Sequence, residues 1–108
     1  FISCEQKQPK MKIQNRKLNI EVDSLQNIIS FYIHLENVGD KDLIIEKVNT
    51  SCKCLVGFEK KINISPKTKD SIKINYINDE KISHTEEIVI ISNTKPKINF
   101  VEVKLNMK

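Results

Sequence analysis

Residues 35–55, LENVGDKDLIIEKVNTSCKCL, decide the fold. The stretch begins with the end of an alternating apolar pattern, passes through turn-forming residues at 37–42, and continues as a second apolar segment at 43–48. It ends in two cysteines, Cys52 and Cys54, with one residue between them. Two extended segments separated by turn-forming residues are typical of strands, so this stretch predicts an all-β protein.

The same pattern continues through the rest of the chain. From about residue 18, apolar and polar residues alternate with a period of two, which is typical of strands that bury one face. We expect about seven short strands, over residues 18–23, 29–36, 43–48, 62–64, 72–76, 88–91 and 100–107. No window has the apolar spacing of a helix. The prediction is an immunoglobulin-like (Ig-like) β-sandwich over residues 18–108.

Composition supports one soluble domain that lacks the inter-sheet disulfide and buried Trp of antibody domains. The chain has 108 residues, of which 39% are hydrophobic and 30% charged, as expected for a single globular unit. It has no Trp, and its cysteines do not fall on two facing strands. Antibody-type domains need both features, so we expect a sandwich without the inter-sheet disulfide.

The net charge of +4 lies in the first 17 residues. They hold one acidic group, Glu5, and five basic ones, Lys7, Lys10, Lys12, Arg16 and Lys17, so the remaining residues are neutral overall (+4 minus +4). A nucleic-acid-binding domain usually carries its positive charge on the fold, with Arg and aromatic residues interleaved. We therefore expect no nucleic-acid partner.

The amino terminus, Phe1-Ile2-Ser3-Cys4, resembles the end of a bacterial lipoprotein signal, with apolar residues, a small residue and then a cysteine. The resemblance implies that Cys4 carries a lipid anchor and that residues 1–3 are removed. Residues 1–17 are then a signal remnant and polar tether, and the protein lies in the bacterial cell envelope, periplasmic or at the outer membrane. The alternative is an ordinary free cysteine in a frayed terminus.

Residues from about 19 to 107 also resemble a bacterial family of Ig-like envelope domains of unknown function. Its pattern is Asn-x-Gly, an apolar strand, Ser-Cys-Gly-Cys-Thr, an Ile-x-Pro-Gly turn, an Ile-rich strand ending in an aromatic residue, and Ser-Asn. The matching residues are Asn37, Gly39, Leu43, Ile45, Val48, Ser51, Cys52, Cys54, Ile64, Pro66, Ile72, Ile74, Tyr76, Ser92 and Asn93. The chain departs from the pattern at Lys53, Leu55 and Lys67. The resemblance implies a sandwich related to the chaperone-pilin and sperm-protein types, in exported proteins, and implies no activity.

Cys52 and Cys54 are the sharpest candidates for chemistry. In an extended strand their Cα atoms would lie about 6.6 Å apart on one face, near the upper limit for a disulfide unless a local turn closes them. Three interpretations stand: a structural pair, reduced or bridged; a redox pair whose thiolate Lys53 favours; and a soft-metal site, which needs further ligands. Lys53 in place of Gly argues against a tightly folded ligand loop.

The two histidines are the remaining candidate ligands. His34 lies on the outward face of its predicted strand and is a candidate third member of a Cys52–Cys54 metal site, whereas His84 falls in a polar loop at 78–85. Glu86 and Glu87 are adjacent, so they point to opposite faces and make a poor carboxylate pair. The sequence has no phosphate-binding loop and no nucleophile elbow. We expect no catalytic residue, no cofactor and no small-molecule substrate.

Two hypotheses for function follow. The first is a non-enzymatic lipoprotein module, held at the membrane through Cys4, that binds an envelope protein by edge-strand pairing, with the outward Tyr32 and His34 adding contacts. The second is a thiol redox or soft-metal-binding protein that uses Cys52 and Cys54.

Overall fold

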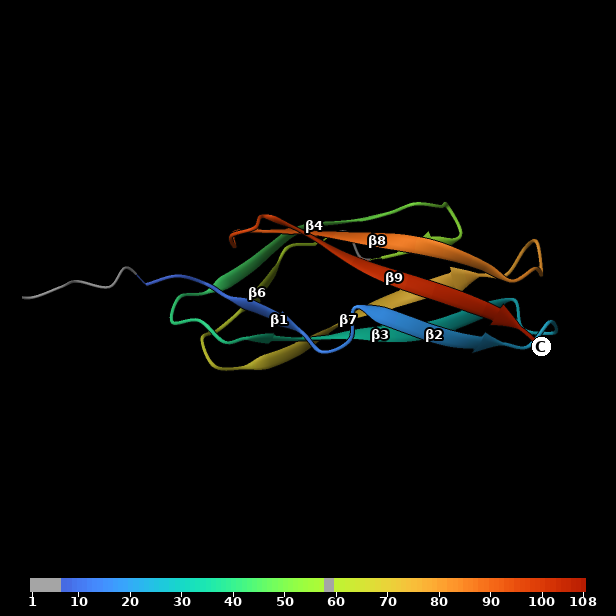
Figure 1. Ribbon diagram of the computed structural model, residues 1–108, viewed down its shortest axis with the longest axis horizontal. Coiled ribbons are helices and arrows are strands. Elements are labelled where there is room, and N and C mark those ends of the chain that lie inside the picture. The colour runs from blue at the N-terminus through green and yellow to red at the C-terminus, as the bar shows by residue number, and fades with distance from the viewer. Residues whose placement is uncertain (1–6, 58–59) are drawn as a thin grey trace, which may run out of the picture.

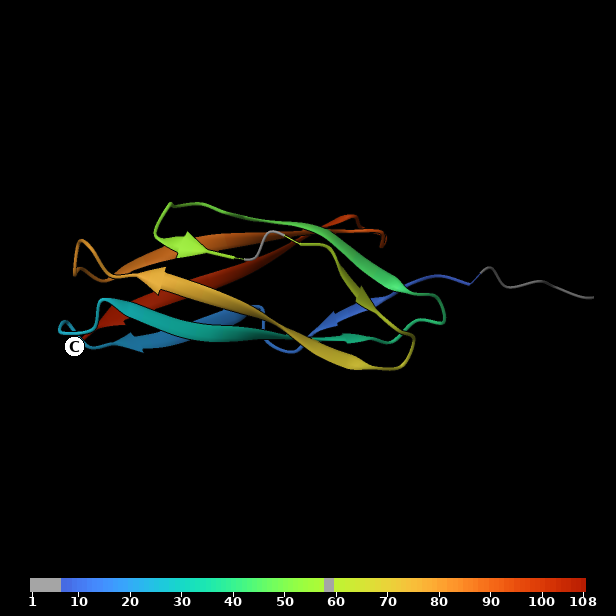
Figure 2. The same cartoon turned by 180° about the vertical axis from the view of Figure 1, so that it is seen from behind.

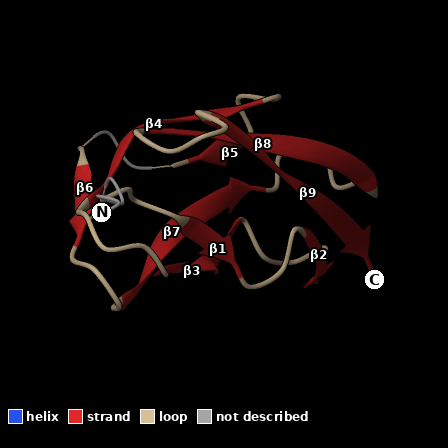
Figure 3. Ribbon diagram, turned by 60° about the vertical axis from the view of Figure 1, so that its left-hand side comes forward, coloured by secondary structure: helices blue, strands red, loops and turns tan. Residues whose placement is uncertain are grey.

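The computed structural model of the protein describes residues 7–57 and 60–108. Within these ranges the chain forms strands and loops, and no helix there is long and apolar enough to cross a membrane (Figure 3). The strands are β1 (Met11–Ile13), β2 (Lys17–Val22), β3 (Ile28–Asn37), β4 (Leu43–Thr50), β5 (Leu55–Val56), β6 (Ile62–Ile64), β7 (Lys69–Ile77), β8 (His84–Ser92) and β9 (Ile98–Met107). The predicted all-β class is confirmed.

The strands form two sheets that pack face to face as an Ig-like sandwich (Figures 1 and 2). The four-stranded sheet has the order β1-β3-β7-β5, and the five-stranded sheet has the order β2-β9-β8-β4-β6. All pairings are antiparallel except that of β2 with β9. The core between the sheets consists of Ile13, Val22, Phe31, Ile33, Leu35, Leu43, Ile45, Leu55, Ile64, Ile72, Ile74, Tyr76, Ile88, Ile90, Val101, Val103 and Leu105.

The period-two alternation predicts the buried face of each long strand correctly. In β3, Phe31, Ile33 and Leu35 are buried while the residues between them are exposed. The alternation is interrupted within β4, where the β4–β8 pairing shifts in register between Ile45 and Lys47.

The folded unit begins earlier than the predicted boundary at residue 18. Met11–Ile13 forms β1 and pairs with the end of β3, with Ile13 buried and Met11 packed against the core. Residues 14–16 then lead to the other sheet, where the chain continues as β2. Three residues give too short an alternation to stand out among the basic residues around them. With β5, which is shorter still, β1 accounts for the two strands beyond the expected seven.

The Asn37 side chain ties the two sheets together at one end of the sandwich. Asn37 is fully buried; its amide nitrogen donates to the carbonyls of Lys41 (2.8 Å) and Ile64 (2.9 Å), and its amide oxygen accepts from the Gly39 N–H (3.0 Å). Asn37 ends β3 in one sheet, and Ile64 ends β6 in the other. Residue 39 must be Gly because a Cβ there would collide with the Gln8 carbonyl oxygen.

Asn37→Ala is expected to destabilise the fold by about 3 kcal/mol, because it removes the side-chain hydrogen bonds to the Lys41 and Ile64 carbonyls and to the Gly39 N–H in a buried site. Urea unfolding at neutral pH measures the loss. Asn19→Ala, at an exposed position of β2, is the matched control and should change the free energy of unfolding very little. Equal effects of the two substitutions would contradict this account of Asn37.

Lys67 adopts a conformation that favours Gly. Its φ is 61°, and the Thr68 N–H bonds back to the Ser65 carbonyl (3.3 Å), as in a type II turn. Lys67 and Lys53 both stand where the resembled family pattern has Gly. Among the described non-glycine residues, however, only Lys67 and Lys81 have positive φ.

Substitutions at these two lysines should therefore behave differently. At position 67 we expect the Gly variant to be more stable than the Ala variant by about 1 kcal/mol, since a Cβ is strained in the left-handed region. At position 53 the order should reverse, because Gly there only adds entropy to the unfolded chain. Denaturant midpoints of the four variants test this, and the same order at both positions would contradict it.

Candidate functional site

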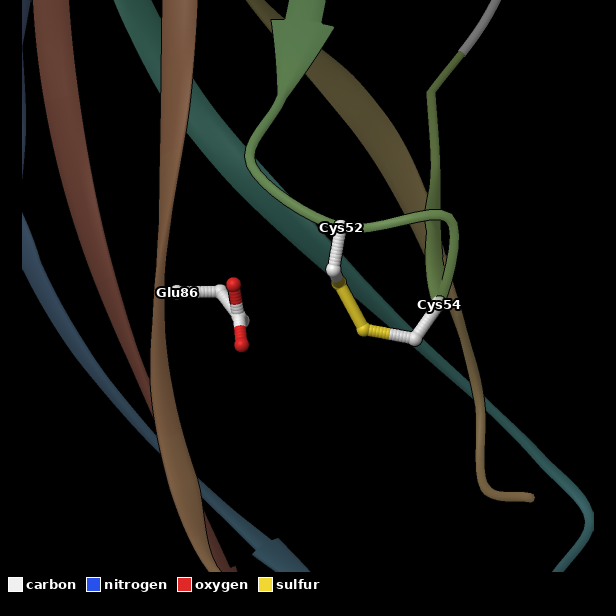
Figure 4. A group of neighbouring side chains, drawn as sticks. All are labelled: Cys52, Cys54 and Glu86. Carbon is white, nitrogen blue, oxygen red and sulfur yellow. A yellow bond between two sulfur atoms is a disulfide. The ribbon is translucent and has the colours of Figure 1, made fainter. Parts of the chain in front are cut away.

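Cys52 and Cys54 lie in the turn between β4 and β5 and are joined by a disulfide (Figure 4). Their Cα atoms are 5.2 Å apart, closer than in an extended strand, because the chain turns at this point. The Thr50 hydroxyl lies within hydrogen-bonding distance of the carbonyls of Cys52 (2.8 Å) and Leu55 (2.9 Å), which holds the turn closed. The pair is therefore bridged in this structure, and a bridge fits both the structural and the redox interpretation.

The disulfide faces a carboxylate from a neighbouring strand. Figure 4 shows Glu86, on β8, pointing toward the two sulfur atoms. One ligand atom from each of Cys52, Cys54 and Glu86 falls within 4.8 Å of the other two, and all three side chains are half-buried. They line a cavity of about 280 Å³ together with Lys53, Tyr76, Ile77, Asp79, Glu80 and His84.

A continuous chain of hydrogen bonds runs behind Glu86. His84 Nδ1 lies 2.7 Å from one carboxylate oxygen of Glu86, and the Ser51 hydroxyl donates to the other at 2.6 Å. His84 Nε2 lies 3.0 Å from the Tyr76 hydroxyl, and the Glu87 N–H donates to Ser51 Oγ at 2.7 Å. Both carboxylate oxygens of Glu86 are thus held in place.

The protonation states of Glu86 and Tyr76 indicate which atoms donate in the hydrogen bonds through His84. The Ser51 hydroxyl, followed by the His84 imidazole, lowers the pKa of Glu86, although partial burial acts in the opposite direction. Burial, with the nearby charges of Glu80, Glu86 and Asp79, raises the pKa of Tyr76. Since an ionised carboxylate only accepts, His84 Nδ1–H donates to Glu86, and a neutral His84 with its proton on Nδ1 accepts at Nε2 from the Tyr76 hydroxyl.

The structure brings together a different set of residues from the one the sequence predicts. His34, the predicted third member, lies on β3 opposite Ser71 and lines a separate groove with Lys12 and Gln14. His84 is the histidine beside the cysteines, and it is the first residue of β8 rather than part of a loop. Glu86 and Glu87 do point to opposite faces, and only Glu86 joins the site. Cys4 lies outside the described residues.

A sequence signal for His84 and Glu86 exists. They precede Ile88 and Ile90 at a spacing of two, so they share the face of β8 that is buried further along the strand. The polar composition of residues 78–85 conceals this signal, because such a composition is typical of a loop. Their position next to the cysteines also depends on the pairing of β4 with β8, which matches Thr50 with Ile88 and brings the Ser51 N–H to the Glu87 carbonyl.

The Glu86 interactions predict a pH-dependent stability. The folded pKa of Glu86 is lowered, so its ionised form stabilises the fold above the ordinary Glu value of about 4.3, and this contribution is lost as the pH falls through the folded pKa. The difference in unfolding free energy between the natural protein and Glu86→Gln should thus be largest at neutral pH and shrink below about pH 4.

Urea unfolding at a series of pH values measures that difference. Glu87→Gln is the matched control, since Glu87 is the neighbouring residue on the opposite face of β8. A pH dependence that is the same for the two variants would contradict the stabilising role of Glu86.

The fold and the site together define an Ig-like sandwich with a disulfide-bearing cleft between the β4–β5 turn and the start of β8. The chain belongs to the family described as "Protein of unknown function (DUF1573)", whose match covers residues 11–107. The comparison with curated protein sequences finds no match.

Solved structures of similar fold come from bacteria and from humans. A protein of unknown function from Porphyromonas gingivalis W83 matches with a TM-score of 0.79 and 19% identity over 91% of this chain and 46% of that one. The PapD-like domain 7 of human CEP192 gives 0.76 and 8% identity, covering 98% and 90%. A chain of the CsuC–CsuE chaperone–tip adhesion subunit complex of Acinetobacter baumannii gives 0.66 and 9% identity, covering 92% and 57%.

These similarities establish the fold only, because the identities are low. This chain spans about half the length of the Porphyromonas gingivalis protein, with 46% of that chain covered.

Proposed function

We propose that this protein is a non-enzymatic binding module of the bacterial cell envelope, anchored through Cys4, that pairs the free edge of β3 with an extended segment of a partner protein. The observation that carries the proposal is the open backbone edge of β3. The anchor and the envelope location rest on the Phe1-Ile2-Ser3-Cys4 sequence.

Backbone hydrogen bonds identify which groups of β3 are open. The Gln14 N–H donates to the His34 carbonyl, and the Val38 N–H donates to the Lys10 carbonyl, so even-numbered residues of β3 face the β1 side. Within the described residues, β1 and its extension reach only as far as His34. By the alternation of an antiparallel ladder, the backbone groups of Ser30 and Tyr32 then point to the unpaired side. These groups are a template for another strand.

Exposed apolar side chains flank this edge and offer specificity. Tyr32 is 48% exposed, Ile28 64% and Leu25, in the preceding turn, 85%. Tyr32 stacks on His34 with ring centroids 6.4 Å apart, which gives the outer face of β3 a rigid aromatic surface. In strand addition, main-chain bonds supply affinity and side chains of this kind select the partner sequence.

The structural similarities support binding of protein rather than of a small molecule. One similar structure is a pre-assembly complex of a chaperone with a tip adhesion subunit, so a sandwich of this type is found in a protein complex. The partner proposed here is an envelope protein that offers an extended segment.

A proline on the open edge tests the proposal. Ser30→Pro removes an N–H that points away from β7, so the fold should survive while partner pairing is lost. Asn19→Pro is the matched control on β2, which ends the other sheet. The Arg16 and Val22 carbonyls accept from the N–H groups of Glu102 and Lys108, so the Asn19 N–H faces away from β9.

Peptides selected by display against the natural protein provide the partner. We expect them to bind the natural protein and Asn19→Pro equally and Ser30→Pro at least tenfold more weakly, and to slow hydrogen exchange at Ser30 and Tyr32. Selected peptides that bind all three proteins equally, or protection confined to other strands, would refute edge pairing.

A further inference from the structure

We propose that the Cys52–Cys54 pair is a redox-gated zinc site. When the disulfide is reduced, the two cysteine sulfurs, as thiolates, and the Glu86 carboxylate bind one Zn²⁺. Exchange with a small disulfide oxidant, which takes two electrons from the sulfurs and two protons from solvent to become two thiols, closes the Cys52–Cys54 bond and releases the ion. The inference is independent of the β3 edge, which lies elsewhere on the sandwich.

The ligand set suits Zn²⁺ in kind and in position. Zn²⁺ binds cysteine sulfur and carboxylate oxygen in a tetrahedral arrangement, and the ligand atoms of Cys52, Cys54 and Glu86 already lie within 4.8 Å of one another. They come from two separate elements, the β4–β5 turn and β8, which the β4–β8 pairing holds together. The carboxylate, a hard ligand, favours Zn²⁺ over Cu(I). The cleft leaves the fourth position to water.

Neighbouring side chains orient the Glu86 carboxylate by hydrogen bonds, as they do for metal-binding carboxylates. Metal-binding carboxylates are usually oriented by hydrogen bonds from a second layer of residues. Glu86 has this support from Ser51 (2.6 Å) and His84 (2.7 Å), and His84 is in turn held by Tyr76 (3.0 Å). Its carboxylate is therefore fixed in orientation before any ion arrives.

The charge of the cleft also favours a cation. Glu86, Asp79 and Glu80 line it, and Lys53 is the one lysine among the described residues that line it. The two sulfurs bind a metal as thiolates, so binding would add further negative charge to this site. One divalent cation offsets the charge of both thiolates.

The gate is thiol–disulfide exchange with a small dithiol reductant. The reductant's two sulfurs end joined as a disulfide, while its two electrons and two protons leave Cys52 and Cys54 as two thiols. Zn²⁺ then binds both sulfurs as thiolates, and the two protons pass to solvent. The fold should survive this step, because a bridge between residues two apart constrains very little of the unfolded chain.

The test measures Zn²⁺ binding by the natural protein in both redox states, without oxygen, by competition with a coloured chelator after a phosphine reductant has been applied and removed. We expect one Zn²⁺ per chain for the reduced protein and none for the oxidised protein. Glu86→Gln should weaken binding at least tenfold, whereas Glu87→Gln, the neighbour on the opposite face of β8, should leave it unchanged. Co²⁺ should show sulfur-to-metal charge-transfer absorption in the reduced protein.

Four results would overturn the proposal: no one-to-one binding by the reduced protein, equal binding by the two redox states, equal affinities of Glu86→Gln and Glu87→Gln, or one-to-one binding by Cys52→Ser/Cys54→Ser. Circular dichroism of each variant, oxidised and reduced, establishes that a loss of Zn²⁺ is not a loss of fold. If Cys52→Ser/Cys54→Ser still bound one Zn²⁺, the ion would lie elsewhere.

Discussion

The rest of the structure depends on the buried amide of Asn37. Two sheets packed only through apolar side chains are free to slide, because hydrophobic contact is not directional. Asn37 removes that freedom, since its amide bonds the carbonyls of Lys41 and Ile64 and the N–H of Gly39, each in a fixed direction. A buried amide cannot exchange these partners for water, so the alignment of β3 with β6 is set at this one point.

Other asparagines and turns extend the same constraint. The Asn93 side chain accepts from the Ile44 N–H and donates to the Asp42 carbonyl, which fastens the end of β8 to the start of β4. The Lys67 backbone N–H donates to the Asn37 carbonyl, which joins the β6–β7 turn to the same point. With the β4–β8 alignment fixed in this way, the turn after β4 reaches the start of β8, where the cysteines meet Glu86.

Local pattern predicts the fold well and the site poorly, for a physical reason. The alternation in β3 and β9 reports directly which side chains are buried, because burial of one face is a property of the strand itself. The approach of Cys52 to Glu86 is different, since it depends on how β4 and β8 align across a separation of more than thirty residues. His34 lies on a clearly alternating predicted strand, whereas His84 falls in a polar stretch that does not show it to be the first residue of β8. The proposed lipid anchor at Cys4 lies outside the described residues.

The disulfide contributes little to the stability of the sandwich. The turn it spans is already closed by the Thr50 hydroxyl and by the bond from the Leu55 N–H to the Cys52 carbonyl. Structural disulfides stabilise mainly by linking distant parts of a chain, and this one links residues two apart. Asn37, by contrast, joins the sheets and offers no chemistry. Folding and reactivity are thus assigned to separate residues, so the state of the sulfurs can change while both sheets and the free edge of β3 stay in place.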